Sequence, residues 1–213
     1  MSTVKANNYQ VGQSITATNN FTLYQPSTPD ATLRLGNGNA GSVTDLLVLN
    51  SSGNLGLGVT PSGWFGKTLQ LGVYSAVSQE YNGYAALSNN SYEYASSAYK
   101  YLASSYPAAL YRQASGQHQW LTAPSGTAGN PISFTQAMTL DASGNLGIGT
   151  TSPAGRLDVY TAGGGTSYFR DASVNAYIGS NTTSGFVGTG TNHPFVFNTN
   201  NTERMRLDSS GNL

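Results

Sequence analysis

Short runs of alternating apolar and polar residues follow one another along this 213-residue chain. Residues 55–58 and 146–149 both read as an apolar residue, Gly, an apolar residue and Gly. A period of two predicts β-strands with one apolar face, and segments 177–178 and 195–197 are further strand candidates because aromatic and branched residues favour strands. The best helix candidate, residues 92–109, spaces its tyrosines by two and by five, which favours strands or an extended loop. The pattern predicts an all-β fold of short strands and hairpins with little or no helix.

The chain also contains an internal repeat. Residues 49–58, LNSSGNLGLG, recur 91 residues later as residues 140–149, LDASGNLGIG. A third copy begins another 67 residues on, at Leu207, and reaches Leu213 before its Gly-x-Gly half. In each copy an Asp or Asn side chain can hydrogen-bond its own backbone, and the Gly accepts a positive φ. Each copy therefore predicts a hairpin turn.

The intervals between the copies correspond as well. Leu87 and Ile178 each lie 29 residues after the last Gly of their copy, and residues 118–121 match residues 193–196, which also begin with His. We interpret the chain as an N-terminal segment, residues 1–40, followed by two β modules, residues 41–139 and 140–213. The second module ends at the start of a third repeat. Two loop expansions, the larger one rich in Tyr, account for the greater length of the first module.

Composition excludes several classes of protein. Only 8% of the residues are charged, with nine Lys plus Arg against nine Asp plus Glu, whereas nucleic-acid binding by phosphate neutralisation needs a basic excess. Cysteine is absent, which excludes a disulfide framework and a Cys-based zinc site. No apolar run approaches the roughly 18 residues of a membrane span. We expect no nucleic-acid partner, no membrane insertion and no cofactor.

Candidate catalytic and metal-binding groups are sparse. A glycosidase needs two carboxylates about 5 to 10 Å apart, but the acidic residues of the modules are scattered singly: Asp141, Asp158, Asp171 and Asp208. His118 and His193 occupy matching repeat positions, yet neither has a second ligand residue near it in the sequence, and a metal site needs several. The Gly-x-Gly pairs do not continue into a nucleotide-binding motif. We expect no catalytic residue and no metal, and interpret the chain as a protein that is not an enzyme.

Each module has few large apolar residues for its number of strands. A repeat of roughly 67 to 91 residues with this composition buries too little to be stable alone. We therefore expect the repeated Leu, Ile and Val positions to pack against other chains, as stacked repeats do. Gly within a strand marks the close approach of another backbone, and we expect that backbone to belong to a neighbouring chain.

At this point the residues resemble a known family. Residues 203–213, ERMRLDSSGNL, and residues 147–153, GIGTTSP, are similar to the "ERMRIDSSGNVGIGTTSP" repeat of tailed-bacteriophage fibre proteins. Residues 123–138 are similar to the same group, and residues 4–26 resemble the start of virion fibre proteins. The motif is specific for this architectural class and weak for any one protein.

The resemblance implies an elongated, intertwined homotrimeric β-repeat fibre that is attached to the virion at its N-terminus and contacts a host-cell receptor. Such shafts are often followed by an endosialidase-type intramolecular chaperone, so we expect the 213 residues to be the N-terminal part of a longer fibre. The implied localisation is the virion, at the tail or fibre, after assembly in the host cytoplasm. The implied partners are other copies of the chain, tail, baseplate or other virion proteins, and the receptor.

Three sets of residues are the candidates for these roles. For trimer packing we expect the repeated apolar positions Leu55, Leu57, Leu146, Ile148 and Leu213. For virion attachment we expect the apolar and aromatic residues of the N-terminal segment Val4, Tyr9, Val11, Phe21 and Tyr24. The Tyr-rich loop expansion supplies candidates for receptor contact, Tyr92, Tyr94, Tyr99 and Tyr101, because Tyr combines a rigid apolar body with a polar tip. The alternative for these tyrosines is a role in the core of the enlarged module.

Two other functions stay open at this point. One is a polysaccharide-degrading tailspike, which release of reducing sugar from host capsule would identify. The other is a cellular trimeric surface adhesin, which would need a secretion signal and a membrane anchor.

Overall fold

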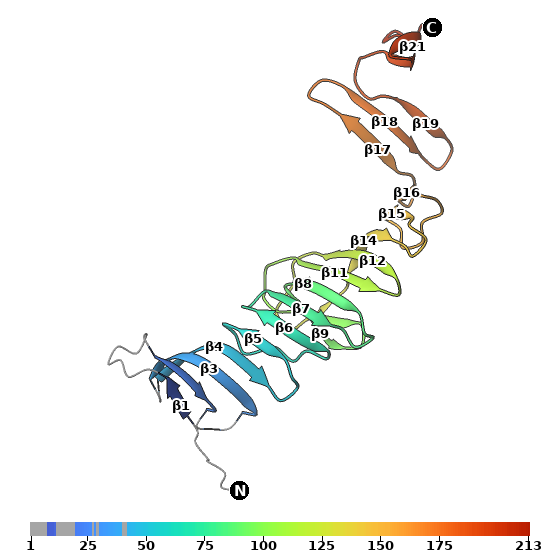
Figure 1. Cartoon of the computed structure of the whole chain (residues 1–213). Coiled ribbons are helices and arrows are strands. Elements are labelled where there is room, and N and C mark those ends of the chain that lie inside the picture. Colours follow the sequence, from blue (N-terminus) through green and yellow to red (C-terminus); the bar gives the residue numbers. More distant parts are fainter. Residues whose placement is uncertain (1–7, 12–19, 27, 29, 40–41) are drawn as a thin grey trace. The chain divides into compact units, whose positions relative to one another are not determined.

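The computed structural model describes residues 8–11, 20–26, 28, 30–39 and 42–213, and within these ranges it contains strands and turns but no helix. The predicted all-β fold is therefore confirmed. The chain divides into two compact units, Met1–Ser143 and Gly144–Leu213, which we call unit 1 and unit 2 (Figure 1).

Unit 1 is built on one large sheet in which nearly every strand pairs with the next strand of the chain. Its strands, in spatial order, are β1 (Asn8–Val11), β2 (Phe21–Tyr24), β3 (Thr32–Asn39), β4 (Ser42–Asn50), β5 (Leu55–Leu57), β6 (Lys67–Leu71), β7 (Ser75–Gln79), β8 (Ala85–Asn89), β11 (Ala108–Ala114), β12 (Gln117–Ala123) and β14 (Thr135–Leu140). All neighbours in this series are antiparallel except β5 and β6, which are parallel.

The turn of the repeat forms as predicted. In the first copy the Asn50 and Asn54 backbones are bonded (N···O 3.0 Å), and Gly53 has a φ of 80°. In the third copy Asp208 and Asn212 make the same bond at 2.8 Å, and the Asp208 carboxylate accepts from the Asn212 backbone N–H at 2.8 Å. The Asx side chain and the positive φ of Gly thus close each hairpin.

The glycines that alternate with apolar residues lie under a loop of the same chain. A Cβ on Gly56 would lie 2.0 Å from the Val59 carbonyl oxygen, and a Cβ on Gly147 would lie 2.9 Å from the Thr150 carbonyl oxygen. The close backbone is therefore the chain's own crossover between two parallel strands. The expectation that a neighbouring chain approaches these glycines was wrong.

A β-bulge marks each copy of the repeat. One extra residue interrupts the antiparallel ladder at Leu46, at Ala137 and at Arg204. These positions lie 91 and 67 residues apart, which are the intervals of the repeat itself. Bulges of this kind are designed features of a fold rather than defects, so the repeat is structural as well as sequential.

The pairing corrects one detail of the repeat alignment. Trp120 pairs with Met138, and in the later copy Phe197 pairs with Met205. Trp120 therefore corresponds to Phe197, two residues beyond the match made from sequence. By the same register His118 corresponds to Phe195, so the two histidines are not structurally equivalent.

A smaller sheet covers part of one face of the large sheet. It consists of β9 (Ser91–Ala95), β10 (Ala98–Tyr101) and β13 (Pro131–Ile132), which come from the loop expansions of the first module. We call this sheet the lid. Its Tyr99 packs with Ala86, Leu110 and Leu121 of the large sheet, all of them buried. This contact is the main apolar core of unit 1.

Unit 2 consists of small sheets with no lid. Its strands are β15 (Leu146–Ile148) and the parallel β16 (Leu157–Val159), the antiparallel β17 (Thr166–Arg170), β18 (Asn175–Ser180) and β19 (Gly185–Thr189), and the hairpin of β20 (Phe195–Thr199) and β21 (Thr202–Leu207). None of residues 144–213, all of which the structure describes, has a buried hydrophobic side chain.

Candidate functional site

A continuous row of apolar side chains crosses one face of the large sheet. The register places Leu49 beside Leu55, Leu69 beside Val77, and Leu87 beside Tyr111, and paired residues of adjacent strands lie on the same face. The full row runs from strand to strand through Leu33, Leu49, Leu55, Leu69, Val77, Leu87, Tyr111, Trp120 and Met138. A shorter parallel line contains Leu23, Leu35, Leu47, Leu57 and Leu71. We call the face that carries both lines the apolar face.

The apolar face is the exposed face of the sheet. Leu87 is 54% exposed and Val77 is 45% exposed, whereas their sequence neighbours Ala86 and Ala76 are 4% and 2% exposed on the opposite face. The opposite face also buries polar side chains, among them Gln70, whose carboxamide oxygen accepts from the Trp64 indole N–H at 3.0 Å. The usual arrangement of polar side chains outside and apolar side chains inside is thus inverted. An exposed contiguous apolar patch marks an interaction surface.

The same exposed positions recur in unit 2. Leu49 of the first copy is 39% exposed, and its counterpart Leu207 is 41% exposed. Leu87 and its counterpart Ile178 are 54% and 56% exposed. Because the copies differ in many other residues, the persistence of exposed apolar side chains at equivalent positions indicates a shared role.

The predicted trimer-packing residues lie on this repeated surface or at the turn that leads to it. Leu55 and Leu57 are in β5 within the two apolar lines, and Leu57 is 40% exposed. Their counterparts Leu146 and Ile148 form β15 beside β16. Leu213 follows the third repeat turn and is exposed. Sequence reasoning missed the longer row, which includes Leu87 and Val77, because only strand register brings these residues together.

A buried polar network joins the lid to the large sheet. The Tyr99 hydroxyl donates to the Glu80 carboxylate at 2.6 Å, and Arg112 lies 3.7 Å from the same carboxylate. Burial raises the pKa of Glu80, while Tyr99 and Arg112 act in the opposite direction. Burial, and then the hydrogen bond to Glu80, raise the pKa of Tyr99. A second buried carboxylate, Glu93, accepts from the backbone N–H groups of Tyr81 and Ser97, both at 2.9 Å.

These carboxylates were not among the sequence candidates, because charged residues are rarely fully buried. Glu80 is 3% exposed and Glu93 is 1% exposed. Their oxygens accept hydrogen bonds from the protein itself, so the arrangement fixes the lid on the sheet.

The four candidate receptor-contact tyrosines separate into two groups. Tyr99 and Tyr101 are each 6% exposed inside unit 1, so a receptor cannot reach their rings, and the expectation was wrong for these two. Tyr92 is half-buried against Trp64, with ring centroids 6.0 Å apart. Tyr94 is 37% exposed and lies under the Lys100 ammonium group, 4.4 Å from the ring centroid.

The candidate attachment residues lie around the first three strands. Val4 is outside the described residues, and Tyr9 and Val11 belong to β1, which pairs with β2. Phe21 is 46% exposed. The Tyr24 hydroxyl donates to the Asp45 carboxylate, which Arg34 also binds, so Tyr24 serves the packing of its own sheet.

Other binding chemistry is limited. Within the described residues no group of three or more His, Asp or Glu side chains is placed to hold a metal ion. His118 is bonded through Nδ1 to the Tyr111 hydroxyl at 2.6 Å on the apolar face. In the part of the chain that the structure describes, no helix is long and apolar enough to span a membrane.

Comparison with known protein families, with curated proteins and with solved structures gave no match.

Proposed function

We propose that this chain is a structural subunit of a homotrimeric fibre or spike of a tailed bacteriophage. Its copies associate through the apolar face, its N-terminal segment attaches to the particle, and the assembly supports host recognition and adsorption. The observation that carries the proposal is the apolar row, which recurs at equivalent repeat positions and is left exposed by the single chain.

The composition of unit 2 supports association between copies. Burying apolar surface is the dominant favourable term in folding, and a 70-residue unit is marginal even with a well-filled core. Unit 2 has no buried hydrophobic side chain, while Phe169 and Val187 are 69% and 59% exposed. A second chain is the simplest source of the missing core, because it brings the same apolar positions at the same spacing.

The low charge supports the same conclusion. The residues of the apolar row and of its parallel line carry no formal charge, with His neutral. Around a threefold axis every charge would occur three times at short distance in a poorly solvated setting, where like charges repel strongly. The absence of Asp, Glu, Lys and Arg from the two lines is what a shared axis requires.

The assignment to a phage particle rests on the repeat motif. The turn, the Gly-x-Gly strand and the Thr-Thr-Ser-Pro segment that resemble the phage fibre repeat form one structural element here. That element comprises the hairpin turn, β15 and the crossover over Gly147. In this proposal a stiff trimer holds distal contacts away from the particle, and several weak contacts add through their effective concentration.

A density map of the intact virus particle tests this function. The proposal predicts a projection with threefold symmetry into which three copies of the unit 1 sheet fit with their apolar faces inward and residues 1–40 against the particle. Peptide mass spectrometry of purified particles supplies the control. The phage assignment fails if the chain is absent from the particles or lies in them as single copies.

A further inference from the structure

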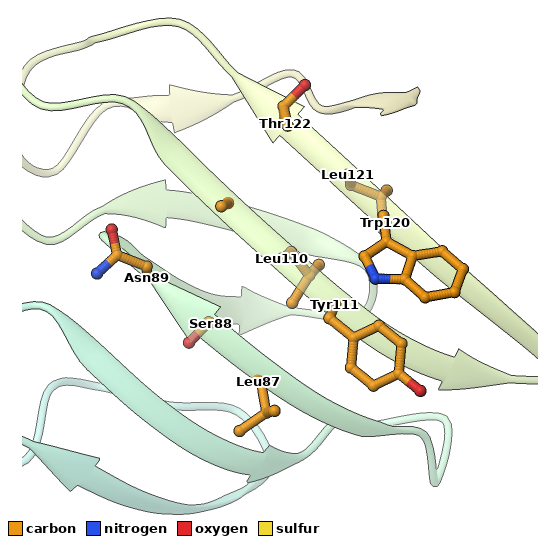
Figure 2. Close-up of a pocket in the computed structure, with 9 residues that line it drawn as sticks. Leu87, Ser88, Asn89, Leu110, Tyr111, Trp120, Leu121 and Thr122 are labelled. Carbon is orange, nitrogen blue, oxygen red and sulfur yellow. The ribbon is translucent and has the colours of Figure 1, made fainter. Parts of the chain in front are cut away.

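The apolar face of unit 1 has an open hollow of about 320 Å³. Figure 2 shows Tyr111 and Trp120 at one end of this hollow and Asn89 at the other. The small side chain of Ala109, which pairs with both Asn89 and Thr122, lies between these ends. The sheet is therefore locally too thin at a point where the rest of the row projects large side chains.

The hollow suits a large ring with one polar atom. Its volume is at the lower end of ligand pockets, and its lining is mainly apolar with a few polar groups at the rim. Asn89 supplies a carboxamide at the rim, and the one hydrogen bond of that side chain given by the structure, from Nδ2 to the Ser75 hydroxyl, is long, at 3.4 Å. The carboxamide oxygen is thus free to accept a hydrogen bond.

Symmetry restricts which side chain can enter. In a closed trimer every copy presents the same surface, so a side chain that enters the hollow comes from the same height of a neighbour's apolar face. The largest side chains at that height are Tyr111 and Trp120. The Tyr111 hydroxyl is already bonded to His118 at 2.6 Å. Among the described residues the Trp120 indole N–H has no hydrogen-bond partner, and a buried indole N–H usually finds one.

We propose that this hollow is a socket for the Trp120 indole of a neighbouring copy, with the indole N–H donating to the Asn89 carboxamide oxygen. The inference rests on the proposed trimer and goes beyond it by naming the contact that sets the relative position of the chains. A Trp seated in a pocket is a frequent centre of interface energy.

Cysteine crosslinking between two kinds of chain tests the socket, since the native chain has no Cys. Ala109→Cys chains and isotope-labelled Trp120→Cys chains are co-expressed, and trimers are isolated and oxidised. Because a disulfide needs Cα atoms about 4.4 to 6.8 Å apart, the proposal predicts disulfides mainly between the two kinds of chain. The matched control pairs Ala109→Cys with Val73→Cys, in the β6–β7 turn, and should give at least tenfold less mixed product.

Each outcome decides a different claim. Trimers in which Ala109→Cys chains crosslink to one another instead would overturn the socket and leave the trimer intact. Unmodified chains that sediment as monomers would overturn both.

Fluorescence supplies a readout that does not need the Trp120→Cys chain to assemble. Trp64→Phe leaves Trp120 as the one remaining Trp of the chain's two. Adding Ala109→Leu fills the socket, and we expect acrylamide to quench Trp120 several-fold more in that double variant than in Trp64→Phe alone, with both proteins trimeric. Equal quenching in the two trimers would overturn the socket.

Discussion

Replacing Leu87 by Ser tests the role of the apolar row at its most exposed position. Full burial of a Leu side chain is worth about 1.5–3 kcal/mol, and Leu87 is 54% exposed in the single chain. The part still to be buried is therefore worth about 1 to 1.5 kcal/mol per chain, or about 3 to 4.5 kcal/mol for three chains. Since about 1.4 kcal/mol corresponds to a factor of ten, Leu87→Ser should weaken trimer formation by two to three orders of magnitude.

Val73→Ser is the matched control for this experiment. Val73 is 53% exposed but lies in the turn between β6 and β7, outside the row. A dilution series followed by sedimentation velocity gives the assembly constant of each variant, and circular dichroism reports whether the strands persist. If Leu87→Ser and Val73→Ser assemble with the same concentration dependence, the row does not hold the copies together and the reasoning is refuted.

Three further predictions concern the fold of unit 1. Leu110→Ala removes a side chain that is 2% exposed and should lower the free energy of unfolding by about 2–5 kcal/mol; a loss under 1 kcal/mol in denaturant titration would contradict the assigned core. Gly56→Ala places a Cβ 2.0 Å from a backbone oxygen and should destabilise the chain by about 1–3 kcal/mol, whereas Gly63→Ala, where a Cβ meets nothing within 4 Å, should stay within about 0.5 kcal/mol. Equal effects on thermal unfolding would refute the close crossover. Because burial raises the pKa of Glu80, its contribution to stability is present below the ordinary carboxyl pKa and is lost as pH rises through the raised pKa. Glu80→Gln should therefore flatten the fall in stability between about pH 4 and pH 7, and an unchanged pH profile would argue against a buried carboxyl at this position.

The strands and turns were the most predictable part of the fold. The Asx residue and the Gly of each repeat dictate a hairpin through local chemistry alone, and the Asp208 turn forms as its sequence indicates. Alternation of apolar residues and Gly likewise identified β5 and β15. These signals are local, so they survive without knowledge of the neighbours.

The partner of each strand face could not be predicted in the same way. Gly56 signalled a close backbone, but sequence spacing cannot distinguish the chain's own crossover at Val59 from another chain. Tyr94 and Tyr99 belong to one Tyr-rich stretch, yet the alternation in β9 and β10 exposes the first and buries the second. Which of them is buried depends on the lid, whose docking surface comes from strands distant in sequence.

The buried carboxylates escaped prediction for a related reason. Glu93 lies between two tyrosines at period two, and the default expectation places the Glu in water and the rings in the core. Here the polar side of β9 faces inward, where Glu93 accepts two backbone N–H groups. The row that includes Leu87 shows the same inversion on the large sheet, and it becomes intelligible once another copy covers the exposed face.

Sedimentation equilibrium of the folded, unmodified chain tests the central claim most directly. One chain has a mass of 22.2 kDa. The account predicts a single species of three chains, about 67 kDa, that persists on dilution to low micromolar concentration, where interfaces of this kind remain closed. A folded species of 22.2 kDa under the same conditions would contradict it.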